Sequence, residues 1–282
     1  MDQRCIVRVR DHAVYLMGGV GKSNRISSSV WVMNGPRTVI QGPPLLCSRI
    51  NHSAVYKDGF IYVIGGYRAI PVLNIDRLDI AEQKWSHFST FDPPDTMLKT
   101  AAVILKDYVY LISNRNMWKI ELCRPLQWQQ VQRLPGSQAE GVCCAVYNDI
   151  LYACNEYHLF AYSANSDRWT VIASVPQGGI YPNCVVLNHY LHLLRRDRHH
   201  RFDFCTRCWQ ARTPNPNSRY FSAVYAQSGR IYVAGGADEL GGCSDAVYSY
   251  DTVSDTWKSE QSLPEARDSM AVVKLTGRLQ WI

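Results

Sequence analysis

One alternation of apolar and polar residues recurs along the chain. Residues 54–66 read AVYKDGFIYVIGG, an apolar run, a short polar turn, a second apolar run and a glycine pair. Two such runs joined by a turn predict a β-hairpin. A first, shorter copy of the pattern ends at Gly18-Gly19. Further copies, conserved to different degrees, lie at residues 102–114, 145–156, 185–196, 223–236 and 271–282. The chain is therefore expected to be an array of one repeated unit.

Two markers give the repeat its length. The glycine pair or its replacement begins at positions 18, 65, 113, 155, 195 and 235, and tryptophans stand at 85, 128, 169, 209 and 257. Both series advance in steps of 40 to 48 residues. Asp79, Asp203 and Asp251 lie six residues before their tryptophans, where a carboxylate can bond to the backbone of a turn two residues on. Each tryptophan would open a fourth strand and fill the space between units. Four strands at this period predict the blade of a β-propeller.

The repeats resemble the kelch repeat, most closely that of BTB–kelch proteins. The resemblance covers nearly the whole chain, and is carried by Gly65-Gly66 with Trp85 and by Gly235-Gly236 with Tyr250-Asp251 and Trp257. Blade one has no tryptophan at the position that opens the fourth strand, and blades three to five lack the glycine pair. The expected fold is all-β, a kelch-type β-propeller of six four-stranded blades, with seven blades as the alternative.

A single domain is expected over residues 1–282. Its blades are predicted at about 4–46, 50–93, 98–135, 140–176, 181–215 and 218–264, with closing strands at 268–282. In BTB–kelch proteins a C-terminal strand completes the first blade, which leaves no free edge. Here residues 5–9 can already supply the inner strand of blade one. Either residues 271–275 displace that segment, or the natural chain continues.

Composition narrows the function classes. The formal charge of +6 is modest for 282 residues, favours acidic partners and does not indicate a nucleic-acid binder. No apolar run has the length of a signal peptide or approaches the ~20 residues that span a bilayer. Ten cysteines in such a chain indicate reduced thiols. We therefore expect a cytoplasmic protein, with a nuclear location also open, and no membrane partner.

Two short motifs resemble ligand sites without meeting their requirements. Residues 19–23 read GVGKS, but Leu16 stands where a phosphate-binding loop needs a glycine, and strand rather than helix follows. Cys205 and Cys208 form a CxxC with His199 and His200 nearby. The strand between the two pairs spans roughly 13 Å, too far for one zinc ion. No metal and no cofactor are expected.

The candidate binding residues are expected at the mouth of the propeller channel. In related BTB–kelch receptors, ligands are held by residues just after the glycine pair and by the links between blades. The densest charge run, 195–201, begins at the glycine-pair position, where guanidinium groups favour a carboxylate or phosphate. Arg and Tyr, typical of binding hot spots, dominate the set. The matching positions are Arg49, Asn51, Tyr67, Arg68, Lys99, Arg115, Asn116, Tyr181, Arg195, Asp197, Arg198, Arg219, Tyr220 and Arg267.

The resemblance implies a protein-binding module rather than an enzyme. It would be the substrate-recognition domain of a BTB–kelch adaptor for a cullin-3 RING ubiquitin ligase, holding an acidic or phosphorylated segment. Cullin-3 would bind through BTB and BACK domains that this chain does not contain, so the chain is either the C-terminal part of a longer protein or a kelch-only protein. The alternative is a cytoskeletal, actin-associated scaffold. An oxidase-type enzyme is a remote third, because no catalytic motif is recognisable.

Overall fold

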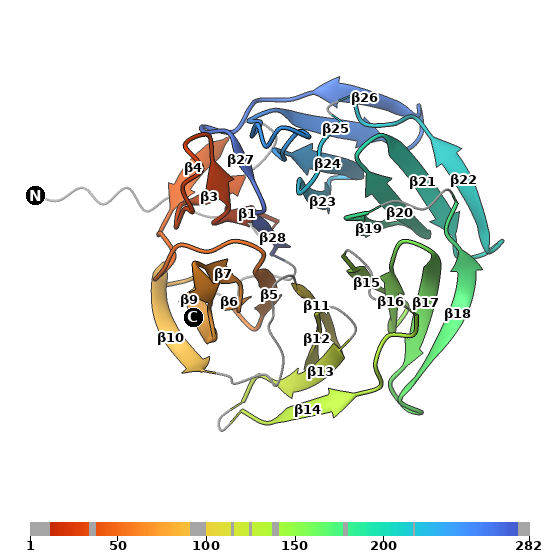
Figure 1. Ribbon diagram of the computed structural model, residues 1–282, viewed down its shortest axis with the longest axis horizontal. Coiled ribbons are helices and arrows are strands. Elements are labelled where there is room, and N and C mark those ends of the chain that lie inside the picture. The colour runs from red at the N-terminus through yellow and green to blue at the C-terminus, as the bar shows by residue number, and fades with distance from the viewer. Residues whose placement is uncertain are drawn as a thin grey trace, which may run out of the picture.

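Six antiparallel sheets surround a central channel. The computed structural model describes residues 12–33, 38–90, 100–113, 116–123, 126–136, 141–176, 180–216 and 218–275. In these residues each of the six large sheets has four strands, and the sheets form a ring like the blades of a propeller (Figure 1). The predicted all-β, six-bladed propeller is confirmed. None of the described residues forms a helix that is long and apolar enough to cross a membrane.

The strands of each blade are counted from the channel outward. Blade one contains β28 (Ala271–Lys274), β1 (Val14–Met17), β3 (Val30–Met33) and β4 (Val39–Gly42). Blade two contains β5 (Ser53–Lys57), β6 (Phe60–Ile64), β9 (Asn74–Asp79) and β10 (Lys84–Thr90). Blade three contains β11 (Thr100–Leu105), β12 (Tyr108–Ser113), β13 (Asn116–Glu121) and β14 (Trp128–Val131).

The second half of the ring repeats this order. Blade four contains β15 (Cys143–Tyr147), β16 (Ile150–Cys154), β17 (His158–Ser163) and β18 (Arg168–Ser174). Blade five contains β19 (Asn183–Leu187), β20 (Tyr190–Arg195), β21 (Arg198–Asp203) and β22 (Cys208–Arg212). Blade six contains β23 (Ala223–Gln227), β24 (Arg230–Ala234), β25 (Val247–Asp251) and β26 (Thr256–Ser259).

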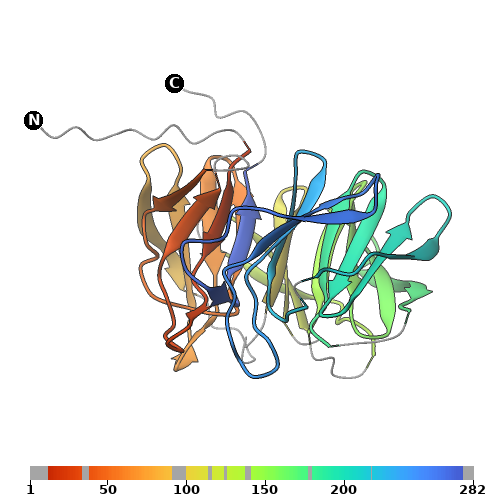
Figure 2. The same cartoon turned by 90° about the horizontal axis from the view of Figure 1, so that it is seen from above.

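Loops between the second and third strands build one face of the ring. In blade two this loop forms a small hairpin of β7 (Tyr67–Arg68) and β8 (Ile70–Pro71). In blade one it contains β2 (Val20–Gly21), which pairs with β27 (Arg267–Asp268) in the link from blade six. Seen from the side, the long loops of blades one, two and six protrude on the same side of the molecule (Figure 2).

The C-terminal strand closes the ring. β28 pairs with β1 in register Val14↔Lys274 to Met17↔Ala271, so it is the innermost strand of blade one. The last copy of the repeat is therefore part of blade one rather than the start of a seventh blade. This pairing covers the inner edge of β1. Residues 5–9, the other predicted candidate for that place, lie outside the described residues.

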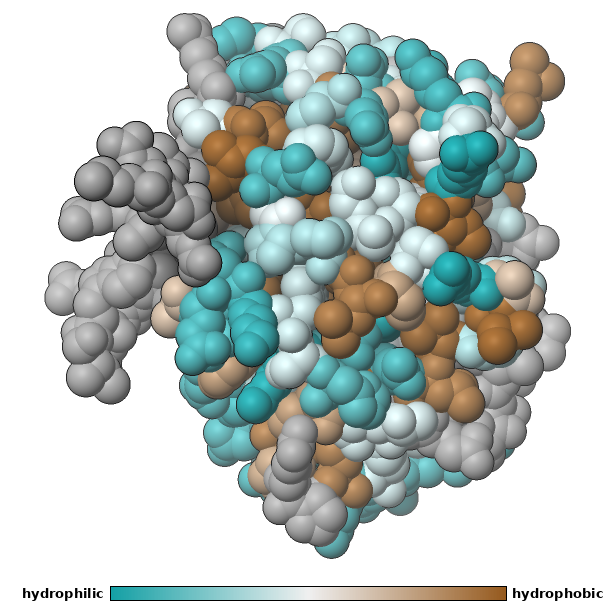
Figure 3. Space-filling view, turned by 90° about the vertical axis from the view of Figure 1, so that its left-hand side faces the viewer, coloured by the Kyte–Doolittle hydropathy of each residue, from teal (hydrophilic) through white to brown (hydrophobic). Residues whose placement is uncertain are grey.

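The hydrophobic core is divided among the interfaces between neighbouring blades. Side chains alternate along each strand: Tyr15 and Met17 pack toward blade two, whereas Val14 and Leu16 pack toward blade six. Six buried clusters result, one at each interface. The outer side near β4 and β10 instead shows hydrophobic patches interrupted by hydrophilic ones (Figure 3).

The predicted roles of the aspartates and tryptophans are confirmed. The carboxylates of Asp79, Asp203 and Asp251 each accept two backbone N–H bonds from the turn that follows. The indole N–H of Trp257 donates to the carbonyl of Thr213 at 2.8 Å, across the interface between blades five and six. Trp85 and Trp169 make the corresponding bonds at their own interfaces. These three tryptophans thus join neighbouring blades.

Replacing Trp257 by Phe should lower the free energy of unfolding by about 1–2 kcal/mol, because it removes the bond to Thr213 and thins the packing against Tyr250. Guanidinium denaturation measures this change. Val253→Ala, at an exposed turn of the same blade, should have no measurable effect. Equal stability of Trp257→Phe and the parent would contradict the interblade role.

Candidate functional site

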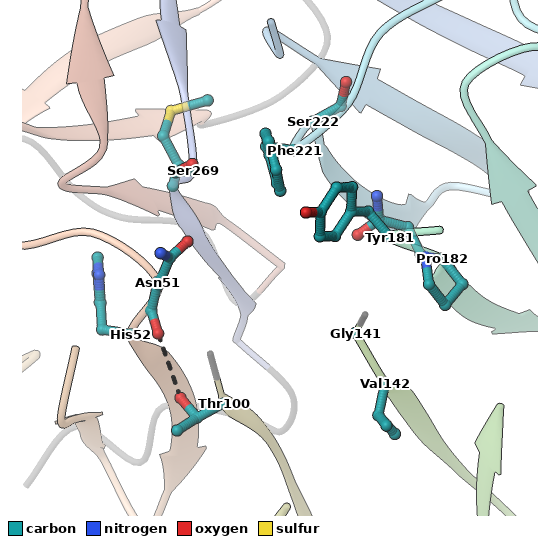
Figure 4. A pocket seen from close by; sticks show the side chains of 12 residues that line it. Asn51, His52, Thr100, Gly141, Val142, Tyr181, Pro182, Phe221, Ser222 and Ser269 are labelled. Atoms are coloured by element: carbon teal, nitrogen blue, oxygen red, sulfur yellow. Dashed lines mark hydrogen bonds between the residues drawn. The ribbon is translucent and has the colours of Figure 1, made fainter. Parts of the chain in front are cut away.

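The links that enter successive blades converge at one end of the channel. Five described link residues line this end and have a positive φ, and each stands two residues before the innermost strand of its blade: Asn51, Gly141, Tyr181, Phe221 and Ser269. They surround a cavity of about 160 Å³. In Figure 4 the rings of Tyr181 and Phe221 lie side by side, across from Asn51 and Thr100. The hydroxyl of Thr100 donates to the backbone carbonyl of Asn51 at 3.4 Å.

Below this cavity the channel changes character. Its middle is lined by strand residues that include Ser53, Cys143, Cys144 and Cys184. Burial raises the pKa of the Cys144 thiol to about 12, so this group remains protonated at neutral pH. The far end is lined mainly by aliphatic side chains of the innermost strands. Polar groups therefore line the mouth and the middle of the channel, whereas the far end is mainly aliphatic.

Arg49 and Arg267 lie buried behind the mouth and join neighbouring blades. The carbonyl of Arg49 accepts the N–H of Gly19 in blade one, and its guanidinium donates to the carbonyl of Gly65 in blade two at 3.2 Å. Arg267 repeats this between blades six and one, through Gly236 and Gly18. A Cβ on Gly18 would lie 2.5 Å from the carbonyl oxygen of Arg49, so the close approach requires glycine there.

Each of these two arginines also has a carboxylate partner. Arg49 is fully buried and forms an ion pair with Asp76, which is itself 1% exposed. Arg267 pairs with Glu265. Contact of these two side chains with a partner protein stays a prediction, and it would require the mouth to open.

Arg195 occupies the glycine-pair position of blade five and reaches in the opposite direction. Its guanidinium lies 3.5 Å from the carbonyl oxygen of Pro176, in the link that precedes its own blade. The residue is 7% exposed, and burial is the main cause that lowers the pKa of its guanidinium. The neighbouring Arg196 is instead at the surface.

The arginines at the rim of the mouth face carboxylates of this chain. Arg196 pairs with Glu239 and lies over the ring of Tyr220, 5.6 Å from its centroid. Arg219 lies 3.4 Å from the carboxylate of Asp238 and donates to the carbonyl of Gly242. Arg198 lies 3.8 Å from its neighbour Asp197. The rim is therefore less basic than a count of its arginines indicates.

Blade two adds a projecting hairpin at this rim. The hydroxyl of Tyr67 donates to the carbonyl of Ala69 at 2.7 Å, which holds the ring along the turn. Arg68 is exposed, and Ile70 at the tip is 71% exposed. Leu240 projects in a similar way from the loop of blade six. An apolar tip beside charged groups is a common feature of protein-binding surfaces.

The other predicted positions are divided between the cavity and the chain outside it. Asn51 and Tyr181 line the cavity, and Tyr220 packs edge-on against Tyr181 with ring centroids 6.0 Å apart. Asn116 is half-buried at the start of β13. Lys99 and Arg115 lie outside the described residues. The structure thus gathers part of the predicted set at one mouth, although partner contact by any of its residues stays a prediction.

Sequence reasoning missed most of the residues that line this cavity, and it also missed four residues of the mouth that its own positional rules reach. Phe221 and Ser269 occupy the same link position as Asn51 and Tyr181, so the spacing before each inner strand would have found them. Asp238 and Glu239 follow the glycine pair of blade six, where the rule used for blades two, three and five was not applied. Their omission made the rim seem more basic.

Neither of the two short motifs of the sequence contributes a residue to the lining of the cavity. Residues 19–23 form β2 and an adjoining turn in blade one. Cys205 and Cys208 are exposed in the outer turn of blade five, whereas His199 is buried at the other end of β21. Within the described ranges, no group of three or more His, Cys, Asp or Glu side chains is placed to hold a metal ion.

Comparisons with known proteins agree with this architecture. The Kelch motif family matches residues 218–264. Kelch-like protein 25 of Xenopus tropicalis is 22% identical over 268 residues, which cover 89% of this chain and 39% of that protein. Mouse Kelch-like protein 35 is 29% identical over 160 residues, covering 53% of this chain and 28% of that protein.

A third relative has a name that records a second kind of domain. Human Kelch repeat and BTB domain-containing protein 6 is 21% identical over 188 residues, covering 65% of this chain and 26% of that protein. The chain therefore spans well under half the length of each of these relatives. Its repeats, its six four-stranded blades and these matches together identify it as a kelch-repeat β-propeller that resembles the kelch domains of BTB–kelch proteins.

Proposed function

We propose that this propeller is the substrate-recognition domain of a BTB–kelch adaptor for a cullin-3 RING ubiquitin ligase. The observation that carries the proposal is the polar cavity at the channel mouth, surrounded by link residues, on a propeller whose relatives are kelch-like proteins. The propeller would hold the substrate without catalysing a reaction, and BTB and BACK domains outside this chain would recruit cullin-3. An open recess with convergent hydrogen-bonding groups is suited to such a role.

The partner segment is proposed to meet the rim as well as the cavity. Arg68 belongs to the projecting hairpin of blade two and Arg198 begins β21 of blade five, where they can contact a segment laid across the mouth. Guanidinium groups bind carboxylates and phosphates through charge-assisted hydrogen bonds, so an acidic or phosphorylated flank remains the expected chemistry at the rim. Ile70 and Leu240 supply apolar contacts nearby.

We expect that replacing Arg68 and Arg198 by Glu in the full-length protein will reduce substrate recovery at least ~10-fold while cullin-3 recovery stays unchanged, since charge at an interface rim mainly affects partner choice and association. Affinity purification followed by quantitative mass spectrometry measures both. Lys106→Glu is the matched control, because this exposed residue lies in a turn at the opposite end of β11 from the mouth.

Each outcome has a separate meaning. Absence of cullin-3 from the full-length complex would contradict the adaptor role, and co-sedimentation with actin would then favour the scaffold alternative. Substrates retained in full by the Arg68 and Arg198 variant would contradict a contribution of the rim. An equal loss in the Lys106 control would show that the change acts through total charge rather than through this face.

A further inference from the structure

The cavity at the mouth is surrounded by residues that have an unusual backbone conformation. Asn51, Tyr181, Phe221 and Ser269 have φ between 52° and 57°, a region that glycine adopts most easily. The corresponding position in blade four is Gly141. Each of these links thus has a positive φ at this position, and in blade four the residue is glycine, with φ 114°. The other four links that the structure describes there carry a side chain instead.

Aromatic residues are the least expected at such a position. A left-handed conformation is unfavourable for residues with a Cβ, and it is rarest for bulky ones. Tyr181 and Phe221 nevertheless adopt it, and their ring centroids lie 4.7 Å apart at 48°. Figure 4 shows both rings at the cavity. Backbone strain of this kind is concentrated at sites of function, so these side chains call for a functional explanation.

The wall of the cavity is uncharged. Its lining is polar on one side, through Asn51, Thr100 and Ser269, and aromatic on the other. His52 also belongs to the lining, and burial, followed by the nearby charge of Arg49, lowers its pKa to about 3, so it is neutral at physiological pH. No Asp, Glu, Lys or Arg is among the lining residues that the structure describes.

Four of the arginines around this cavity are paired with carboxylates and add little free positive charge to it. Arg49 and Arg267 are buried against Asp76 and Glu265. Arg196 and Arg219 at the rim face Glu239 and Asp238. A carboxylate or phosphate entering the cavity would therefore give up part of its hydration without gaining one of these cations, which is unfavourable.

We infer that the cavity accepts an uncharged aromatic side chain of the partner, with unphosphorylated tyrosine favoured over phenylalanine. Its volume of about 160 Å³ is similar to that of an apolar cavity known to hold benzene. The ring would pack against Tyr181 and Phe221, and its hydroxyl would reach the amide and hydroxyl groups of Asn51, Thr100 and Ser269. This inference rests on the proposed function, and it assigns charge recognition to the rim alone.

A random peptide library displayed on phage, selected on the purified propeller, tests this inference. Enriched peptides should share an aromatic residue, and the strongest of them is then synthesised with that residue as Tyr, Phe, Ala, phosphotyrosine or Glu. Fluorescence polarisation should show tyrosine tightest, with losses of about 10-fold or more for Ala, phosphotyrosine and Glu, the size expected when a stacked ring is lost or a charge is buried unpaired.

Variants of the chain separate binding from folding. Tyr181→Gly and Phe221→Gly should each weaken peptide binding about 10-fold or more. The denaturation midpoint should stay unchanged, because the backbone strain that glycine relieves offsets the packing that is lost with the ring. Lys106→Gly is the matched control: it also has a left-handed backbone, with φ 57°, but lies at the other end of β11. It should change neither property.

The alternative results are distinct. Enrichment of acidic peptides whose binding depends on Arg68 and Arg198, and is insensitive to Tyr181→Gly, would overturn this inference and leave the proposed function standing. Tighter binding of the phosphotyrosine peptide would also overturn it. The proposed function itself would be contradicted by two results together: no peptide binds at this face, and the full-length protein keeps all its substrates when the rim is changed.

Discussion

Replacing Arg49 by Met should destabilise the propeller by about 3–5 kcal/mol. The guanidinium of Arg49 forms the ion pair with Asp76 and donates to Gly65, and both partners are buried. Its removal leaves the carboxylate of Asp76 without that cation and the carbonyl of Gly65 without that donor. A buried charge that loses its ion-pair partner costs this much because burial keeps it from regaining its hydration. Asp76 retains only its contact with Nδ1 of the half-exposed His87, at 3.3 Å. Guanidinium denaturation of the single variant measures the loss.

A second substitution distinguishes this cause from simple loss of packing. Arg49→Met combined with Asp76→Leu removes both charges, and it should recover most of the lost stability. Arg68→Met removes an arginine from the exposed hairpin of the same blade, and its effect should be within about 0.5 kcal/mol. If Arg49→Met and Arg68→Met had the same free energy of unfolding, the buried pair would have no structural role. Arg49 would then be a candidate for partner binding alone.

The fold was predictable because its signals are local and repeated. A turn cap such as Asp251 and its tryptophan, Trp257, act within a hairpin and on the adjacent blade, so their spacing alone indicates the unit. Copies that had lost their glycines, such as the one around Arg195, still kept the alternation of apolar residues. Closure by β28 remained open in the sequence because two segments had the pattern of an inner strand.

The state of the arginines was not predictable from position alone. Arg49 and Arg267 lie in links, and only the structure shows that each side chain reaches the glycine pair of the next blade. Arg195 reverses this relation, since it stands at a glycine-pair position and reaches back to a link. The direction of a long side chain depends on which neighbour offers a buried acceptor, and a repeat alignment does not contain that information.

The cavity was only partly predictable for a related reason. The family resemblance drew attention to Arg219 and Tyr220, but the chain turns at the next residue, Phe221, which is the one that lines the cavity. Likewise Asp238 lies far from Arg219 in sequence and comes within 3.4 Å of it in the structure. Net charge at a surface depends on such pairs, which composition does not reveal.

Acidification from pH 7 to 5 should destabilise the propeller by about 4–6 kcal/mol. Three buried histidines contribute, and burial is the main cause that lowers their pKa values: His52 and His192 to about 3, and His199 to about 4. In the unfolded chain a histidine has a pKa of about 6.5, so below that pH the unfolded state binds more protons. Stability is therefore full above about pH 6.5 and falls toward pH 4, by about 2 kcal/mol per histidine at pH 5.

Two of these histidines form a chain of hydrogen bonds within blade five, on the side where His199 packs against Tyr250 of blade six. Nδ1 of His199 lies 3.2 Å from the carbonyl oxygen of Thr213, which can only accept, so Nδ1 carries the proton. Nε2 of His199 then accepts the proton of His192 Nδ1 across 2.9 Å. Protonation of Nε2 would break this bond. Arg212 lowers the pKa of both imidazoles and Arg201 that of His192, whereas Asp255 acts in the opposite direction on His199.

Denaturation midpoints measured between pH 5 and 7.5 test this pH dependence. The double variant His192→Gln with His199→Gln should be less stable at pH 7.5, because it removes the hydrogen bonds that join His192, His199 and Thr213. Its stability should nevertheless fall with pH by only about one third of the parent slope, the share left to His52. His12→Gln changes an exposed histidine and should leave the slope intact. A stability that stayed constant or rose on acidification would contradict neutral burial of the three imidazoles. An unchanged slope in the double variant would place the titrating groups elsewhere in the propeller.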